Sequence, residues 1–87
     1  MVKPLELNSA DYRIKSASIG HSRDGEVFRC TLTPVTDEVL EALDAAARSK
    51  RMIRLIFPSH ALGLQCTEVV RTEPGCVQIA GRVVEAH

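Results

Sequence analysis

Residues 36–49, TDEVLEALDAAARS, decide the fold of this chain because they predict one amphipathic helix with a signal at each end. Thr36 is suited to cap the helix by accepting a hydrogen bond from a free N–H group of the first turn. Asp37 and Glu38 then place negative charge at the positive end of the helix dipole, and Arg48 lies near the negative end. One stripe carries the apolar residues Val39, Leu43, Ala46 and Ala47. We therefore expect a helix that buries one face.

Strand-like segments flank this helix on both sides. Before it, apolar residues alternate in residues 11–19, with a bulge expected near Lys15, and more clearly in residues 27–33. The dipeptide Asp24-Gly25 between them predicts a hairpin turn. In the second strand Phe28, Cys30 and Leu32 share one phase, and we expect that phase to face the helix.

Three more strands are predicted after the helix, at residues 52–57, 64–71 and 76–84. Pro74-Gly75 favours a type II turn between the last two, because glycine adopts positive φ at little cost. The expected fold class is α+β, a small single domain of order β-β-α-β-β-β. Its one helix would pack on an antiparallel sheet or on a small open barrel.

The chain has 87 residues, which suits one domain with a small core. We assign residues 11–87 to a single α+β domain. Residues 1–10 are assigned to an N-terminal arm, whose short alternation of Leu5 and Leu7 is compatible with either an edge strand or a loose extension. Only three large rings, Tyr12, Phe28 and Phe57, contribute to a core that is otherwise aliphatic. Oligomerisation is one way in which so light a core gains buried area.

Composition lowers the expectation of several function classes. Eleven basic residues balance eleven acidic ones, so no overall field attracts the chain to nucleic acid or anionic lipid. No apolar run has the length of a membrane span or the form of a secretory signal, and we expect a cytoplasmic protein that does not contact a membrane. The odd set Cys30, Cys66 and Cys76 has no framework spacing, which favours free thiols.

Sequence signals for catalysis or cofactor binding are weak. A thiol nucleophile needs a neighbouring base, and His60 with Cys66 or Cys76 is the pairing that the sequence offers, without any hydrolase signature. The same residues and Cys30 lack the spacing of a metal site. The glycines are isolated and form no phosphate-binding loop. We expect no enzyme activity, no cofactor, no metal and no small-molecule substrate.

Two surface features suggest an interaction role. Met52, Ile56 and Val84 lie on the second face of otherwise inward-facing strands, and we expect them to contact another protein surface. Near the end of the helix, a basic patch is formed by Arg48, Lys50, Arg51 and Arg54, which Arg71 or Arg82 would extend.

The favoured function is a non-catalytic protein-interaction or assembly module. It would be a homo-oligomer or a small subunit of a larger complex, as are some phage-encoded structural or inhibitory proteins, although only composition carries that association. The alternative is a nucleic-acid-associated regulatory protein that uses the basic patch.

Overall fold

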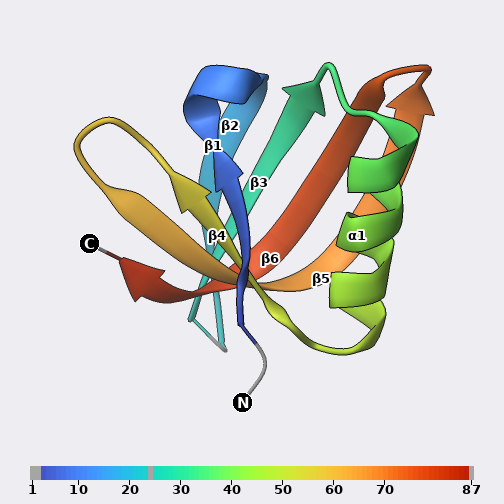
Figure 1. The fold of residues 1–87 in the computed structure, drawn as a ribbon. Helices are drawn as coiled ribbons and strands as arrows, with labels where there is room; N and C mark the ends of the chain where they lie inside the picture. Colours follow the sequence, from blue (N-terminus) through green and yellow to red (C-terminus); the bar gives the residue numbers. More distant parts are fainter. Residues whose placement is uncertain (1–2, 24, 87) are drawn as a thin grey trace.

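A computed structural model describes residues 3–23 and 25–86 of the chain. They form a small single domain of one helix and one six-stranded sheet, an α+β arrangement in which the sheet predominates (Figure 1). The elements are β1 (Leu5–Asn8), the 3-10 turn η1 (Ser9–Asp11), β2 (Arg13–Ser22), β3 (Gly25–Thr33), α1 (Asp37–Arg48), β4 (Met52–Ile56), β5 (Ala61–Glu73) and β6 (Cys76–Ala86).

The sheet is mixed, which corrects the antiparallel sheet expected from the sequence. Its strand order is β1-β4-β5-β6-β3-β2. Four of the five pairings are antiparallel, but β1 runs parallel to β4, with Leu5 opposite Ile53 and Leu7 opposite Leu55. Part of the segment that we assigned to an arm is therefore an edge strand. The alternation in a four-residue strand is too short to predict a strand from the sequence. Its partner, β4, is also distant along the chain.

The sheet is strongly curled. In a flat sheet the two edge strands β1 and β2 would lie about 24 Å apart, at a spacing of about 4.8 Å per strand. These two strands are consecutive in the chain, and the five residue-to-residue steps from Asn8 to Arg13 span at most about 18 Å. The η1 turn shortens that reach further. The two edges must therefore approach each other, as the proximity of β1, η1 and β2 in Figure 1 illustrates.

Helix α1 closes the concave face of this sheet. Thr36 Oγ1 accepts a hydrogen bond from the Val39 N–H at 3.3 Å, which confirms the predicted N-cap. Leu43 and Ala46 of the helix are buried against the sheet. The buried sheet residues include Phe28, Cys30, Leu32, Ile53, Leu55, Leu64, Val77 and Ile79. The predicted inward phase of β3 is thus confirmed.

The hairpin strands extend further than the alternation indicated. Strand β2 continues to Ser22, so only two residues separate it from β3, and Asp24 of the predicted turn lies outside the described residues. The register shift between Lys15 and Ser18 agrees with the predicted bulge. Gly75 has φ of +80°, as a type II turn after Pro74 requires. No helix in the described part of the chain has the length and apolar content to cross a membrane.

Candidate interaction surfaces

The outer face of the sheet, which points away from α1, carries an ion-paired row across β1, β4, β5 and β6. The register aligns Glu6, Arg54, Gly63 and Glu85. Arg54 Nη2 lies 3.0 Å from Glu85 Oε1, and Arg54 Nη1 lies 3.6 Å from Glu6 Oε2. Gly63 leaves the room for Glu85 to reach across β5, because a Cβ there would lie 2.8 Å from the Glu85 Cβ.

The predicted interface residues lie on either side of this row. Met52 and Ile56 are both half-buried on the outer face of β4, and Arg54 stands between them. Val84 is 47% exposed and falls at the register shift between β5 and β6. The three side chains therefore do not form one continuous apolar patch.

The four residues of the predicted basic patch stay only partly together, because Lys50 and Arg51 line one hollow whereas Arg54 lies on the outer face of β4. Arg54 is held by two carboxylates, and the Arg51 Nε donates a hydrogen bond to the Lys3 carbonyl oxygen at 2.5 Å. Among residues 3–23 and 25–86, neither the Arg48 guanidinium nor the Lys50 ammonium has an ion pair or hydrogen bond. Carboxylates thus neutralise only Arg54 among the four cations of the patch in the described residues.

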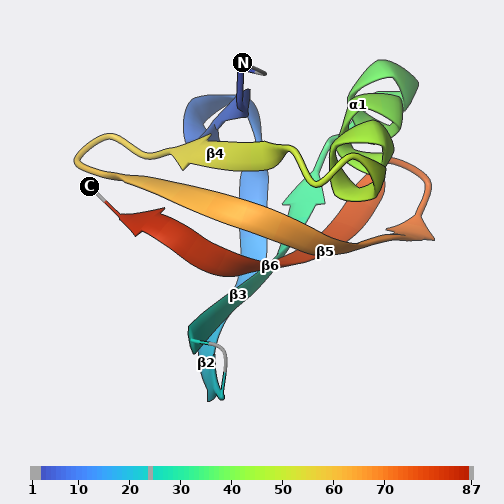
Figure 2. The same ribbon diagram turned by 90° about the horizontal axis from the view of Figure 1, so that it is seen from below.

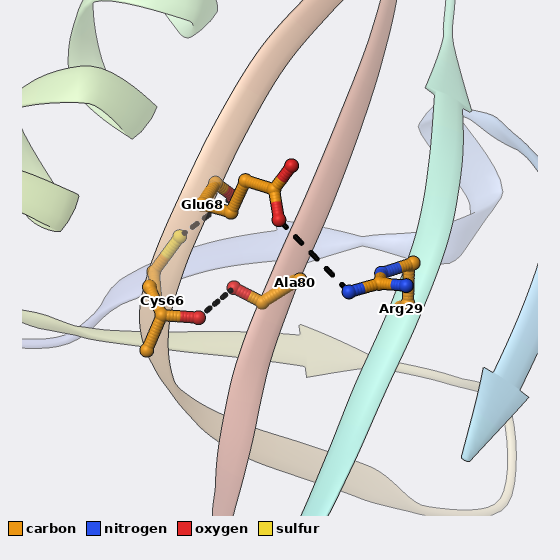
Figure 3. Close-up of polar contacts among 5 residues, drawn as sticks. Arg29, Cys66, Glu68 and Ala80 are labelled. Atoms are coloured by element: carbon orange, nitrogen blue, oxygen red, sulfur yellow. Dashed lines mark hydrogen bonds and ion pairs between the residues drawn. The ribbon is translucent and has the colours of Figure 1, made fainter. Parts of the chain in front are cut away.

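A second cross-strand ion pair lies further along the outer face. Arg29 of β3 and Glu68 of β5 flank Ala80 of β6 in register, and their charged groups are 3.9 Å apart (Figure 3). Ala80 is only 3% exposed although it lies outside the main core. Both charged side chains are about half-exposed, so the pair adds little stability.

Strand β2 presents the most accessible backbone of the sheet. It is an edge strand that pairs only with β3, and nine of its ten residues are exposed. Edge strands are usually protected by charge, by a bulge or by shortness. Arg13, Lys15 and the register shift protect the first part of β2, whereas residues 18–22, SIGHS, carry no Asp, Glu, Lys or Arg. Ile19 in this segment is 51% exposed, the largest value among the exposed large apolar residues described.

The hairpin formed by β2 and β3 projects from the body of the domain (Figure 2). Strand β6 pairs with β3 only from Val27 onward, so Gly25 and Glu26 have β2 as their sole strand partner. A two-stranded ribbon is marginally stable in water. This end of the hairpin would therefore gain from a third strand.

Two adjoining hollows lie beside the hairpin. One, of about 230 Å³, is lined by Ser22, Val27, Gln65, Thr67 and Arg82. The other, of about 430 Å³, is lined by Ala47, Lys50, Gln65, Cys66, Thr67 and Arg82. The two hollows share Gln65, Thr67 and Arg82, and we call them together the Arg82 groove. The sequence offered Arg82 only as an optional extension of the basic patch.

The cysteines occupy separate packing environments. Cys30 and Cys66 are buried, and Cys76 is half-buried. Burial raises the pKa of the Cys30 thiol to about 11. Burial also raises the pKa of Cys66, with smaller contributions in the same direction from the carboxylates of Asp44 and Glu68 and a smaller opposing one from the Glu68 backbone. Both thiols are accordingly protonated at neutral pH, which is the opposite of what a thiol nucleophile requires.

His60, the candidate base, contacts neither Cys66 nor Cys76. Its ring stacks on Phe57 with the centroids 4.6 Å apart, and its Nδ1 lies 3.4 Å from Ser59 Oγ. No cluster of three His, Cys, Asp or Glu side chains suited to a metal ion occurs within the described ranges.

Comparison of the chain with protein-family models, with curated proteins and with solved structures finds no match.

Proposed function

We propose that this protein is a non-catalytic assembly module that associates with itself through the free edge of β2. The observation that carries this proposal is the combination, in residues 18–21 of the edge strand β2, of a backbone edge that no other strand of the sheet covers, no formal charge when His21 is neutral, and a half-exposed isoleucine. Such an edge is a template for strand addition, because its outward N–H and C=O groups bind the backbone of another strand.

A second copy of β2 is the partner that this edge fits best. Antiparallel pairing of the two copies about Gly20 would place Ile19 of each copy opposite His21 of the other, so that apolar and ring surfaces meet. The paired segment brings no like charges together, and the chain as a whole has no net charge to oppose association. The geometry is a closed two-fold dimer with a continuous sheet across the interface.

The outer face of β4 is the less favoured surface for the same function. Its Met52 and Ile56 are half-buried and are separated by Arg54, which is bound to two carboxylates. A partner that covered both apolar side chains would also have to desolvate this charged group, at a cost that its existing ion pairs only partly offset.

Sedimentation of the parent and two matched variants tests the proposal. Ile19→Lys places a charge on the free edge at an exposed position, and Ile56→Lys makes the same change on the sheet face. We expect the parent to rise above the 9.5 kDa of a single chain as its concentration is raised to several hundred micromolar. The Ile19→Lys variant should remain at that mass, and the Ile56→Lys variant should associate as the parent does.

Two results would contradict the proposal. If the mass of the parent protein stays at 9.5 kDa at every concentration, the protein does not self-associate and the proposal is wrong. If Ile56→Lys dissociates the dimer while Ile19→Lys leaves it intact, the dimer forms through the sheet face and not through the β2 edge. Circular dichroism of both variants establishes that each remains folded before their masses are compared.

A further inference from the structure

The Arg82 groove contains two cations that nothing in the described structure neutralises. Arg82 lines both hollows and is exposed, and Lys50 lines the larger hollow. Neither side chain has a hydrogen bond or ion pair with any residue in the ranges 3–23 and 25–86. No Asp or Glu is among the residues that line the two hollows.

The other polar groups of the groove already have partners. Gln65 Nε2 donates a hydrogen bond to the Lys50 carbonyl oxygen at 2.6 Å, and Thr67 Oγ1 donates one to the Ala80 carbonyl oxygen at 3.3 Å. Ser22 Oγ likewise donates to the Gly25 carbonyl oxygen. The charged groups of the groove are therefore both cations, Lys50 and Arg82.

Lys50 has an unusual backbone that provides a second, independent observation. Its φ of +57° is left-handed, at the position after the helix end where glycine is preferred. The Arg51 N–H donates to the Ala46 carbonyl oxygen at 2.8 Å, which is the bond that closes this type of helix end. A lysine is thus present where glycine would be more stable, and strained positions of this kind often serve function.

We infer that the Arg82 groove binds phosphate groups of a nucleic-acid backbone through Lys50 and Arg82. The two hollows are lined by residues from Ser22 and Val27 of the β2–β3 hairpin to Ala47 and Lys50 at the end of α1, so successive phosphates of an extended chain fit them better than one compact anion. Arg29, which lies diagonally across from Arg82 in the sheet register, adds a cation about 7–8 Å away that Glu68 partly neutralises. None of the lining residues is aromatic, so the binding would not stack bases and would be independent of sequence.

Phosphate binding at this groove does not depend on self-association through β2. Of the predicted basic patch and its extensions it uses only Lys50 and Arg82. Two phosphate contacts imply weak affinity, with a Kd in the range of about 10⁻⁴–10⁻⁶ M. They also imply that the logarithm of the association constant falls with the logarithm of salt concentration at a slope of about −1.4 to −1.8.

Fluorescence anisotropy with a labelled 20-nucleotide single-stranded DNA of mixed sequence, and with the RNA of the same sequence, tests the groove. At low salt, the double variant Lys50→Ala, Arg82→Ala should bind at least tenfold more weakly than the parent. The control is Arg48→Ala, Arg71→Ala, which removes the same charge from exposed cations outside the groove and should change the affinity by less than twofold. An equal loss in both variants would show a general charge effect and would overturn the inference.

A single substitution separates binding from stability. Lys50→Gly relieves the left-handed strain, so it should raise the urea midpoint of unfolding while it weakens DNA and RNA binding severalfold. A Lys50→Gly protein with raised midpoint and unchanged affinity would exclude Lys50 from the site. Titration with inorganic pyrophosphate tests whether the groove prefers a small anion. If pyrophosphate binds saturably and neither oligonucleotide binds, the ligand is a small anion and the inference is overturned.

Discussion

Gly81 offers the sharpest test of the packing described above, because the atoms around it leave no room for a Cβ. It lies in β6, where the register places it between Cys66 of β5 and Phe28 of β3. A Cβ at this position would lie 2.8 Å from the Gln65 carbonyl oxygen, 3.1 Å from the Cys66 Cα and 3.1 Å from the Leu64 Cβ. Two of these atoms belong to the backbone of the central strand β5. They cannot rotate away, so Gly81→Ala must displace the strand.

The expected cost follows from two opposing contributions. Overpacking of a well-packed interior costs about 1–3 kcal/mol, and contacts with backbone place Gly81 near the upper end of that range. The reduced freedom of the unfolded chain returns about 0.4–1 kcal/mol. We therefore expect Gly81→Ala to lower the free energy of unfolding by about 1.5–2 kcal/mol. With an m-value of about 1 kcal/mol/M, the urea midpoint should fall by about 1.5–2 M.

Gly20→Ala is the matched control for this substitution. Gly20 lies in β2 with no atom within 4 Å of the position that a Cβ would occupy, so only the unfolded-state contribution remains. Its urea midpoint should equal that of the parent or rise by up to about 1 M. Both variants should be unfolded at low micromolar concentration to keep association out of the measurement. Equal midpoints for Gly81→Ala and the parent would refute the close approach of β5 and β6.

Two further predictions concern the core. Leu43→Ala should lower the free energy of unfolding by about 2–5 kcal/mol, since Leu43 is fully buried at the centre of the helix face, whereas exposed Glu41→Ala should cost under about 0.5 kcal/mol in the same urea titration. Stability should also fall as pH rises from about 9 to about 11, because the unfolded chain releases the Cys30 thiol proton before the native protein does. Urea unfolding at several pH values across this range should show that the free energy of unfolding declines less steeply in a Cys30→Ala variant than in the parent. An identical decline in the two proteins would contradict the raised pKa.

The candidate surfaces were only partly predictable from the sequence. In the sequence, Ile19 is the last residue of an alternating segment, and nothing near it reveals that β2 is an edge strand of the sheet. Arg54 was grouped with Lys50 because both belong to one basic stretch. The structure separates them, because Arg54 points to the outer face of β4 and meets carboxylates that are distant in the sequence.

By itself the sequence determined the features that depend on a few neighbouring residues. The helix cap at Thr36, the inward phase of β3 and the turn at Pro74-Gly75 each follow from side-chain chemistry and backbone freedom within a span of about four to seven residues. These local energies act in the same way wherever the segment lies in the fold, which explains why they could be recognised along the chain.

Only the tertiary structure decided which segments are neighbours. The parallel pairing of β1 with β4, the curl that brings the two edges together and the meeting of Lys50 with Arg82 all join residues that are far apart in the sequence. Backbone hydrogen bonds are chemically alike at every strand edge, so a strand does not encode its partner. The partner is chosen by burial of the whole core under one helix and by the length of the connections. The free edge of β2 and the Arg82 groove are consequences of that choice.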